Sequence, residues 1–288
     1  MNFSVVFMLI YAVFLVVGKI SKRAFPKIGD LIVLVLIFSI SLWGGAQISG
    51  NSLTSVLLDS LLFSLLVVLI TFGVGLVFKK SAYVRDRTSL VYTQLKYGAP
   101  LVLGLIAGLI IRPSLNFSEI INYELFALAA IIGLNMGSEI KFRAIFRVTK
   151  DALLTLIVVI VGGVISAFLL FFVGAIPSLK LAMVMFLGAG WYSYTGPIVS
   201  AYFGPVYGVE AFLVNFLREQ LAFLFVPLLI RAKPNPYSAI AIGGATSMDT
   251  TLGMYSSIFS GEYSVSAMMS GAILTLIIPI ILPLILVT

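Results

Sequence analysis

One stretch of the chain combines an acidic side chain with hydroxyl groups and glycines. In residues 240–260, Asp249 stands beside Thr246, Ser247 and Thr250, and long apolar segments flank the stretch on both sides. A carboxylate at membrane depth is costly unless it faces protein, water or a ligand, so it marks a candidate functional site. Such a group can bind an ammonium group or exchange a proton. The alternative is a carboxylate that caps a helix in a loop between membrane segments.

A second polar group interrupts the apolar run of residues 208–230. Asn215 and Glu219 are four residues apart and share a helical face, and Arg218 lies three residues from Asn215. Arg218 or Asn215 is a candidate partner for a substrate carboxylate, and Glu219 is a candidate ammonium ligand or proton relay. A structural ion pair that joins two helices is the alternative explanation, because charged residues inside apolar segments are paired or turned inward.

The third candidate region, residues 187–205, is rich in helix breakers. Gly188, Gly190 and Pro197 make an uninterrupted helix unfavourable there. Trp191 lies between the glycines and the proline. It either belongs to the aromatic belt at the membrane interface or packs against an alkyl chain or an ammonium group by a cation–π contact.

The composition defines the class of protein. Of 288 residues, 61% are hydrophobic and 10% are charged, whereas a soluble domain carries about 25% charged residues. The long apolar runs predict an all-α polytopic membrane protein rather than a β-barrel, which would show short alternating segments. The chain has no Cys and no His, so we expect no disulfide, no metal and no cofactor. We also expect no enzyme, because no nucleophile–base pair is evident.

Ten apolar segments can be distinguished, and three basic connections follow the first, third and fifth. These connections contain 13 of the 18 Lys and Arg residues. The positive-inside rule places them in the cytoplasm and both chain termini outside, so the net charge of +7 marks topology rather than a nucleic-acid partner. The segments cover residues 3–18, 29–47, 56–78, 98–111, 123–140, 151–175, 181–203, 208–230, 238–258 and 264–287.

The segments divide into two halves of five with opposite orientation, residues 1–145 and 146–288, as in an inverted repeat. The fourth segment of each half, residues 98–112 and the Asp249 stretch, is short or interrupted, which points to a transport site. One ambiguity concerns the crossings. If residues 181–203 are re-entrant, residues 238–258 are re-entrant as well, which gives eight crossings and two re-entrant elements instead of ten crossings.

Three motifs occur in order over residues 183–255: GAGWYSYTGPIVSAYFGPVYG, NFLREQLAFLFVPLLIR and GGATSMDTT. They resemble the lysine exporter LysO family. The resemblance implies efflux of L-lysine and its analogues, kinship with the cation–proton antiporter and anion transporter group, and broken, crossed helices like those of sodium–proton antiporters. It also implies a second intramembrane carboxylate near the end of the second segment, but that stretch reads LWGGAQISGN and has none. The matching positions are Trp191, Tyr192, Ser193, Gly196, Asn215, Arg218, Glu219, Ser247, Met248 and Asp249.

These observations predict a secondary transporter of the cytoplasmic membrane that exchanges L-lysine for protons. Sodium as the coupling ion and a homodimer are left open. The alternatives are a sodium–proton or organic-anion carrier of the same fold, or a non-transporting membrane subunit. The expected coupling residues are Asp249, Glu219 and Glu139, of which Glu139 also suits a solvated interfacial position. The expected substrate-binding residues are Asp249, Ser247, Thr246, Thr250, Trp191, Ser193, Asn215, Arg218 and Glu219.

Overall fold

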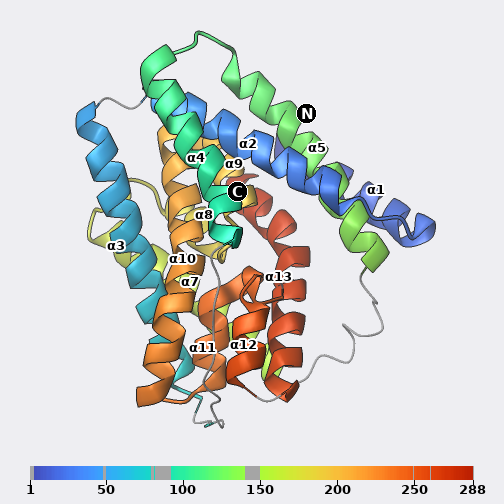
Figure 1. Cartoon of the computed structure of the whole chain (residues 1–288), viewed down its shortest axis with the longest axis vertical. Helices are drawn as coiled ribbons and strands as arrows, with labels where there is room; N and C mark the ends of the chain where they lie inside the picture. The colour runs from blue at the N-terminus through green and yellow to red at the C-terminus, as the bar shows by residue number, and fades with distance from the viewer. Residues whose placement is uncertain are drawn as a thin grey trace.

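The computed structural model describes residues 3–47, 50–78, 81, 92–139, 150–248, 250–259 and 261–287, and over these residues it is helical without any strand (Figure 1). Five of the described helices, α2, α3, α7, α10 and α13, are long and apolar enough to cross a membrane. The predicted all-α polytopic membrane protein is therefore confirmed. The elements are α1 (Phe3–Ser21), α2 (Pro26–Gln47), α3 (Gly50–Gly75), α4 (Tyr92–Ile111), α5 (Phe117–Glu139), α7 (Lys150–Phe172), α8 (Leu179–Leu187), α9 (Tyr192–Phe203), α10 (Pro205–Ala232), α11 (Pro236–Gly243), the 3₁₀ turn η1 (Gly244–Met248), α12 (Leu252–Ile258) and α13 (Gly261–Val287).

Helix ends in the second half coincide with residues that favour them. Gly204 has a φ of 94° between α9 and α10, a conformation that glycine adopts without a steric penalty. Pro205 then occupies the first position of α10, where its missing N–H is not needed. Asn235 precedes α11, and its side chain accepts a hydrogen bond from the Ser238 N–H at 3.1 Å.

Helices α1, α2, α4 and α5 form one layer of the molecule. Helix α1 packs along α5, and α2 packs along α4; Figure 1 shows the first pair crossing obliquely above α13. Glycines make these contacts close. A Cβ at Gly137 would overlap the carbonyl oxygen of Leu15, and one at Gly108 would overlap that of Leu42. Small residues at such contacts are typical of helix packing in membranes.

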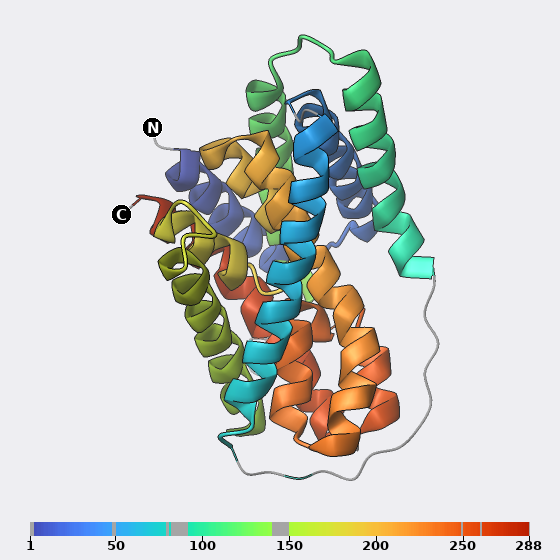
Figure 2. The same cartoon turned by 90° about the vertical axis from the view of Figure 1, so that its left-hand side faces the viewer.

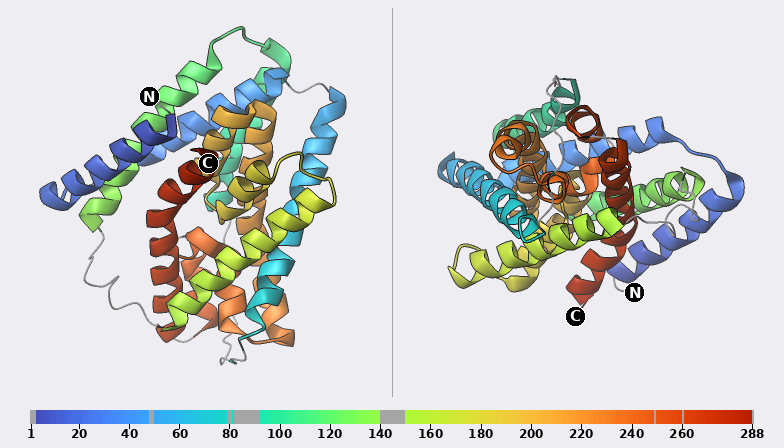
Figure 3. Two further views of the ribbon diagram at one scale, coloured as in Figure 1. Left: turned by 180° about the vertical axis from the view of Figure 1, so that it is seen from behind. Right: turned by 90° about the horizontal axis from the view of Figure 1, so that it is seen from below.

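Helices α3, α7, α10 and α13 surround the remaining short elements. Helix α10 packs against α3, and α7 packs against both α3 and α13. Figure 2 shows α3 and α10 running along the long axis of the molecule. In the same view, the short elements α8 and α9 lie in its upper half, and α11 and α12 in its lower half. Figure 3 shows α7 crossing the opposite face beside α13.

The first pair of short helices, α8 and α9, is a re-entrant hairpin, which we call hairpin one (residues 179–203). Helix α8 turns back along α7, so that a Cβ at Gly163 would lie 3.1 Å from the Phe186 carbonyl oxygen. Helix α9 then returns antiparallel to the first half of α10, with Gly196 against Phe212. The nine residues of α8 span about 14 Å, roughly half of a bilayer core of about 30 Å.

The second pair, α11 and α12, forms hairpin two (residues 236–258) and enters from the opposite end. The Asn235 amide donates hydrogen bonds to the carbonyl oxygens of Gly75, the last residue of α3, at 3.2 Å and of Phe78, three residues further on, at 2.6 Å. The Tyr237 hydroxyl donates to the Asp151 carboxylate at the start of α7. Figure 1 shows α11 and α12 side by side at the lower end of the molecule, beside the first part of α13.

The course of the two hairpins bears on the two predicted counts of crossings. Residues 181–203 and 238–258 each form two short helices that turn back inside the protein, as the alternative with two re-entrant elements requires. The number of membrane crossings stays a prediction, since five of the described helices are long and apolar enough to span. Of the two alternatives for residues 98–112, interruption is wrong, because α4 continues through Pro100, whereas the segment is short, with an apolar part of Val102–Ile111. Both hairpins belong to residues 146–288, whereas the described helices of the first half are continuous. The five-plus-five inverted repeat stays a prediction.

Candidate functional site

The tips of the two hairpins meet between the layers of helices. The Ala245 N–H of hairpin two donates a hydrogen bond of 2.8 Å to the Ala189 carbonyl oxygen of hairpin one. Gly244 has a φ of 60°, and a Cβ there would overlap the same oxygen. Two backbones therefore touch with no side chain between them, and only glycine fits at position 244.

Asn215, on the inner face of α10, holds the tip of hairpin one. Its Oδ1 accepts a hydrogen bond from the Gly190 N–H at 2.8 Å. Its Nδ2 donates to the carbonyl oxygens of Met185 and Ala211, both at 2.9 Å. The side chain is buried, and its acceptor and both donors are engaged by backbone groups.

Arg218, one turn further along α10, holds hairpin two. Its Nε donates to the Ile242 carbonyl oxygen and its Nη2 to the Ala241 carbonyl oxygen, both at 2.9 Å. The last carbonyl oxygens of a helix have no partner within the helix and carry partial negative charge, so a guanidinium group suits the end of α11. The residue is only 1% exposed, and its Nη1 has no hydrogen-bond partner within the described part of the chain.

Two of the hydroxyl groups predicted to assist the Asp249 carboxylate, those of Thr246 and Ser247, form hydrogen bonds with the backbone around the tip of hairpin two. The Thr246 hydroxyl donates to the Gly243 carbonyl oxygen at 2.9 Å. The Ser247 Oγ lies 2.7 Å from the Gly244 carbonyl oxygen and 2.8 Å from that of Ala267 in α13, so its single proton can go to either. Hydrogen bonds therefore fix the tip both internally and against α13.

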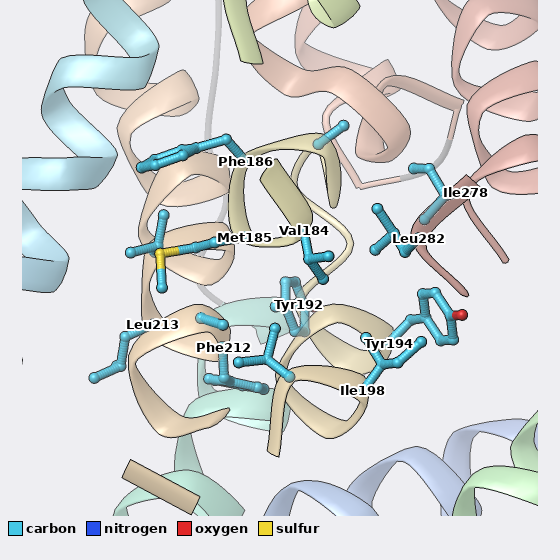
Figure 4. Packing of buried hydrophobic residues seen from close by; sticks show 14 of the residues in the cluster. Val184, Met185, Phe186, Tyr192, Tyr194, Ile198, Phe212, Leu213, Ile278 and Leu282 are labelled. Atoms are coloured by element: carbon cyan, nitrogen blue, oxygen red, sulfur yellow. The ribbon is translucent and has the colours of Figure 1, made fainter. Parts of the chain in front are cut away.

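Aromatic side chains fill the space around hairpin one. Tyr192 packs edge-on against Phe212 and Phe216, with ring centroids 5.2 and 5.4 Å away. Trp191 packs against Tyr194 at 5.3 Å. Figure 4 shows Tyr192 and Phe212 together on the α10 side of α9, and Tyr194 near Ile198 on its other side. This packing fixes the start of α9, where Ser193 is buried.

The remaining predicted residues are placed as follows. Glu219 is buried on α10, next to Arg218 in sequence. Thr250 is described beside the tip of hairpin two and is partly buried. Asp249 lies outside the described residues. Glu139 is the last residue of α5, and its side chain is not among those described.

Sequence reasoning missed Tyr255, which joins the two arms of hairpin two. Its hydroxyl donates to the Ala239 carbonyl oxygen at 3.0 Å and accepts from the Gly243 N–H at 3.1 Å. The side chain is fully buried. The only signal was a tyrosine inside an apolar segment six residues after Asp249, which an aromatic residue at the membrane interface would give equally well.

Broken helices that meet inside a helical membrane protein are an architecture of membrane transporters. The chain belongs to the family described as lysine exporter LysO, which matches residues 99–286, more than half of its length. A family of exporters is one of transporters and not of enzymes. The kinship with cation–proton antiporters stays a prediction.

Two curated relatives are similar to parts of the chain. It is 36% identical over 118 residues to the lysine exporter LysO of Escherichia coli (strain K12). The matched stretch covers 41% of this chain and 37% of the relative. It is also 36% identical over 93 residues to a Haemophilus influenzae protein whose name provisionally assigns lysine export, over 32% of this chain and 44% of that protein. The similarity thus spans less than half the length of each relative. No solved structure matches the chain.

Proposed function

We propose that the protein is a secondary transporter that exports L-lysine and lysine analogues across the cytoplasmic membrane in exchange for protons. Membership of the exporter family and the names of both relatives support lysine as the substrate. The observation that carries the proposal is the meeting of two opposed re-entrant hairpins, with Asp249 in the sequence of one tip. Discontinuous helices of this kind form substrate sites near the bilayer midplane.

The tips offer complementary groups for the two ends of lysine. In the proposal, the Asp249 carboxylate binds the ε-ammonium group, assisted by the hydroxyls of Thr246, Ser247 and Thr250. The α-carboxylate binds at Nη1 of Arg218, which has hydrogen-bonding capacity left within the described structure, because arginine is suited to carboxylates.

Residues of hairpin one and α10 complete the proposed site. The Ser193 N–H at the start of α9 would assist in binding the substrate carboxylate, since the N–H groups of Tyr192 and Tyr194 bond to backbone carbonyl oxygens nearby. Trp191 covers the alkyl chain of the substrate or its ammonium group. Asn215 belongs to the site through the backbone that it holds.

Proton coupling must use carboxylates, because the chain has no histidine. In the proposal, protonation of Asp249 from the outer side releases lysine, and loss of that proton to the cytoplasm resets the site. Glu219, buried on α10, and Glu139 are the candidate relays. Sodium in place of protons would need the same carboxylates.

The proposed orientation has both termini outside and hairpin two open to the cytoplasm. Its base is joined to the start of α7 by the bond between Tyr237 and Asp151. Lys150 and the pair Arg231 and Lys233 therefore gather at one end of the molecule. Positive charge at one end supports a cytoplasmic location for that end.

Counterflow of labelled L-lysine in proteoliposomes, with and without a pH gradient, tests the proposal. Wild-type protein should exchange lysine and respond to the gradient, and Asp249→Asn should reduce exchange to background. Glu262→Gln is the matched control, because Glu262 is exposed at the start of α13, and it should exchange normally.

Each contrary outcome has a distinct meaning. Normal exchange by Asp249→Asn removes the central role of this carboxylate. A folded wild-type protein without lysine counterflow removes lysine as the substrate. Inhibition by sodium or dicarboxylates rather than by excess lysine favours the other carriers, and copurifying partners favour a non-transporting subunit.

A further inference from the structure

One turn of α10 contacts both hairpin tips. Asn215 and Arg218 are three residues apart, which places them on neighbouring positions of one helical face. Asn215 bonds only to α8, to the tip of hairpin one and to α10 itself. Arg218 bonds to the end of α11 in hairpin two. Each residue is 1% exposed, so water does not substitute readily for either set of bonds.

The tips are also bonded to each other. The hydrogen bond from the Ala245 N–H to the Ala189 carbonyl oxygen closes a ring of contacts that runs from α10 through both tips and back to α10. Apart from the bond from Asn215 to Ala211 within α10, the links end on backbone groups that have no helical partner because the helices break there. Loss of one link leaves a buried polar group without its partner, which is costly in a membrane protein.

We propose that Asn215 and Arg218 are positioning residues that hold the two hairpin tips together as one unit. This unit comprises residues 188–191, residues 244–248 and the two side chains on α10. Asn215 then acts on a substrate through the backbone it holds, since both of its donors and one acceptor position are engaged by backbone groups and the side chain is buried. Arg218 uses two of its nitrogens on hairpin two and keeps one for a ligand. The inference deepens the proposed function, but its test requires no transport.

Cysteine labelling tests the proposal, because the natural chain contains no cysteine. A single cysteine is placed in hairpin one as Ser193→Cys, or in hairpin two as Thr246→Cys; both positions are 8% exposed. The rate of maleimide labelling in detergent then reports how often each tip opens. Asn215→Leu and Arg218→Met should each raise the rate at both reporters by about tenfold, as expected for the loss of a buried hydrogen-bond partner.

Gln220→Leu is the matched control. Gln220 lies on the same helix, and its amide has no hydrogen-bond partner among the described residues, so its replacement should leave both rates unchanged. Asn215→Ser is the milder variant in case Asn215→Leu does not fold, since its uncharged hydroxyl keeps one donor and one acceptor at this position. It should give a smaller increase at both reporters.

The effect on the hairpin that the mutated residue does not touch decides the outcome. If Asn215→Leu raises labelling only at Ser193→Cys, and Arg218→Met only at Thr246→Cys, each residue has a local structural role and the proposal is overturned. Unchanged rates at both reporters in folded variants overturn it as well. Because labelling needs no substrate, failure of lysine transport would be recognised separately.

Discussion

At the scale of single residues, position 244 at the tip of hairpin two requires glycine. Its φ of 60° and ψ of −123° are rarely adopted by other residues, and a Cβ would overlap the Ala189 carbonyl oxygen. Gly244→Ala should therefore lower the free energy of unfolding by about 1–3 kcal/mol and separate the tips. Thermal unfolding in detergent measures the first effect, and maleimide labelling of Thr246→Cys measures the second.

The control for this substitution is Gly73→Ala in α3. A Cβ at Gly73 meets no atom within 4 Å, and alanine favours a helix over glycine by about 0.5–1 kcal/mol. Gly73→Ala should therefore leave the protein unchanged or slightly more stable. Equal melting temperatures for Gly244→Ala and the wild type would contradict the close contact between the tips.

The candidate residues were predictable as a set, but their partners were not. Asn215, Arg218 and Ser247 stand out because each is polar within an apolar run. Their partners are backbone groups of the hairpins, such as the Met185 and Ile242 carbonyl oxygens. Such groups lack partners only because the helices break there, which a pattern of side chains does not encode.

At the scale of elements, the sequence predicted where apolar segments lie but not whether each one crosses. Hydropathy measures length and composition, and two short arms joined by a tip have the length of one span. Residues 181–203 and 238–258 therefore resembled crossing helices. Glycine content alone did not predict a break, because α4 contains Gly104 and Gly108 and remains a continuous helix; in α4, glycines serve close packing against α2.

The base of hairpin two depends on Asn235, which joins the end of α3 to the start of α11. Asn235→Ala removes the cap and both bonds to α3, and should destabilise the protein by about 1–2 kcal/mol. Trypsin cleavage after the neighbouring Arg231 should become faster. Thermal unfolding and limited proteolysis measure the two effects.

Asn235→Ser separates the two contributions at this site. Serine can still cap α11 through its hydroxyl but cannot donate both hydrogen bonds to the carbonyl oxygens of Gly75 and Phe78. It should therefore retain part of the stability and still be cleaved faster than the wild type. If serine and alanine behave like asparagine, Asn235 does not anchor the hairpin.

At the scale of the whole molecule, two layers meet along few helices. Helix α2 of the first layer contacts α9 and α10, and α1 contacts α13. Both hairpins, together with Asn215 and Arg218 of α10, belong to the second layer, which contains α3, α7, α10 and α13. Charge and hydropathy had suggested two equivalent halves, but they carry no information on which helices pack together. If the tips stay joined during transport, access must alternate by movement of one layer against the other.

A disulfide between the layers tests this movement. A Cβ at Gly44 in α2 would lie 3.5 Å from the Cβ of Val209 in α10, within the range of about 3.5–4.5 Å found in disulfides. Replacement of Val209 also removes the methyl group that would overlap a side chain at position 44. The double variant Gly44→Cys/Val209→Cys should lose lysine counterflow on oxidation and regain it on reduction, whereas oxidised Val209→Cys alone should remain active. Full activity of the cross-linked protein, with the disulfide demonstrated by mass spectrometry, would show that α2 and α10 move together and that access alternates by another route.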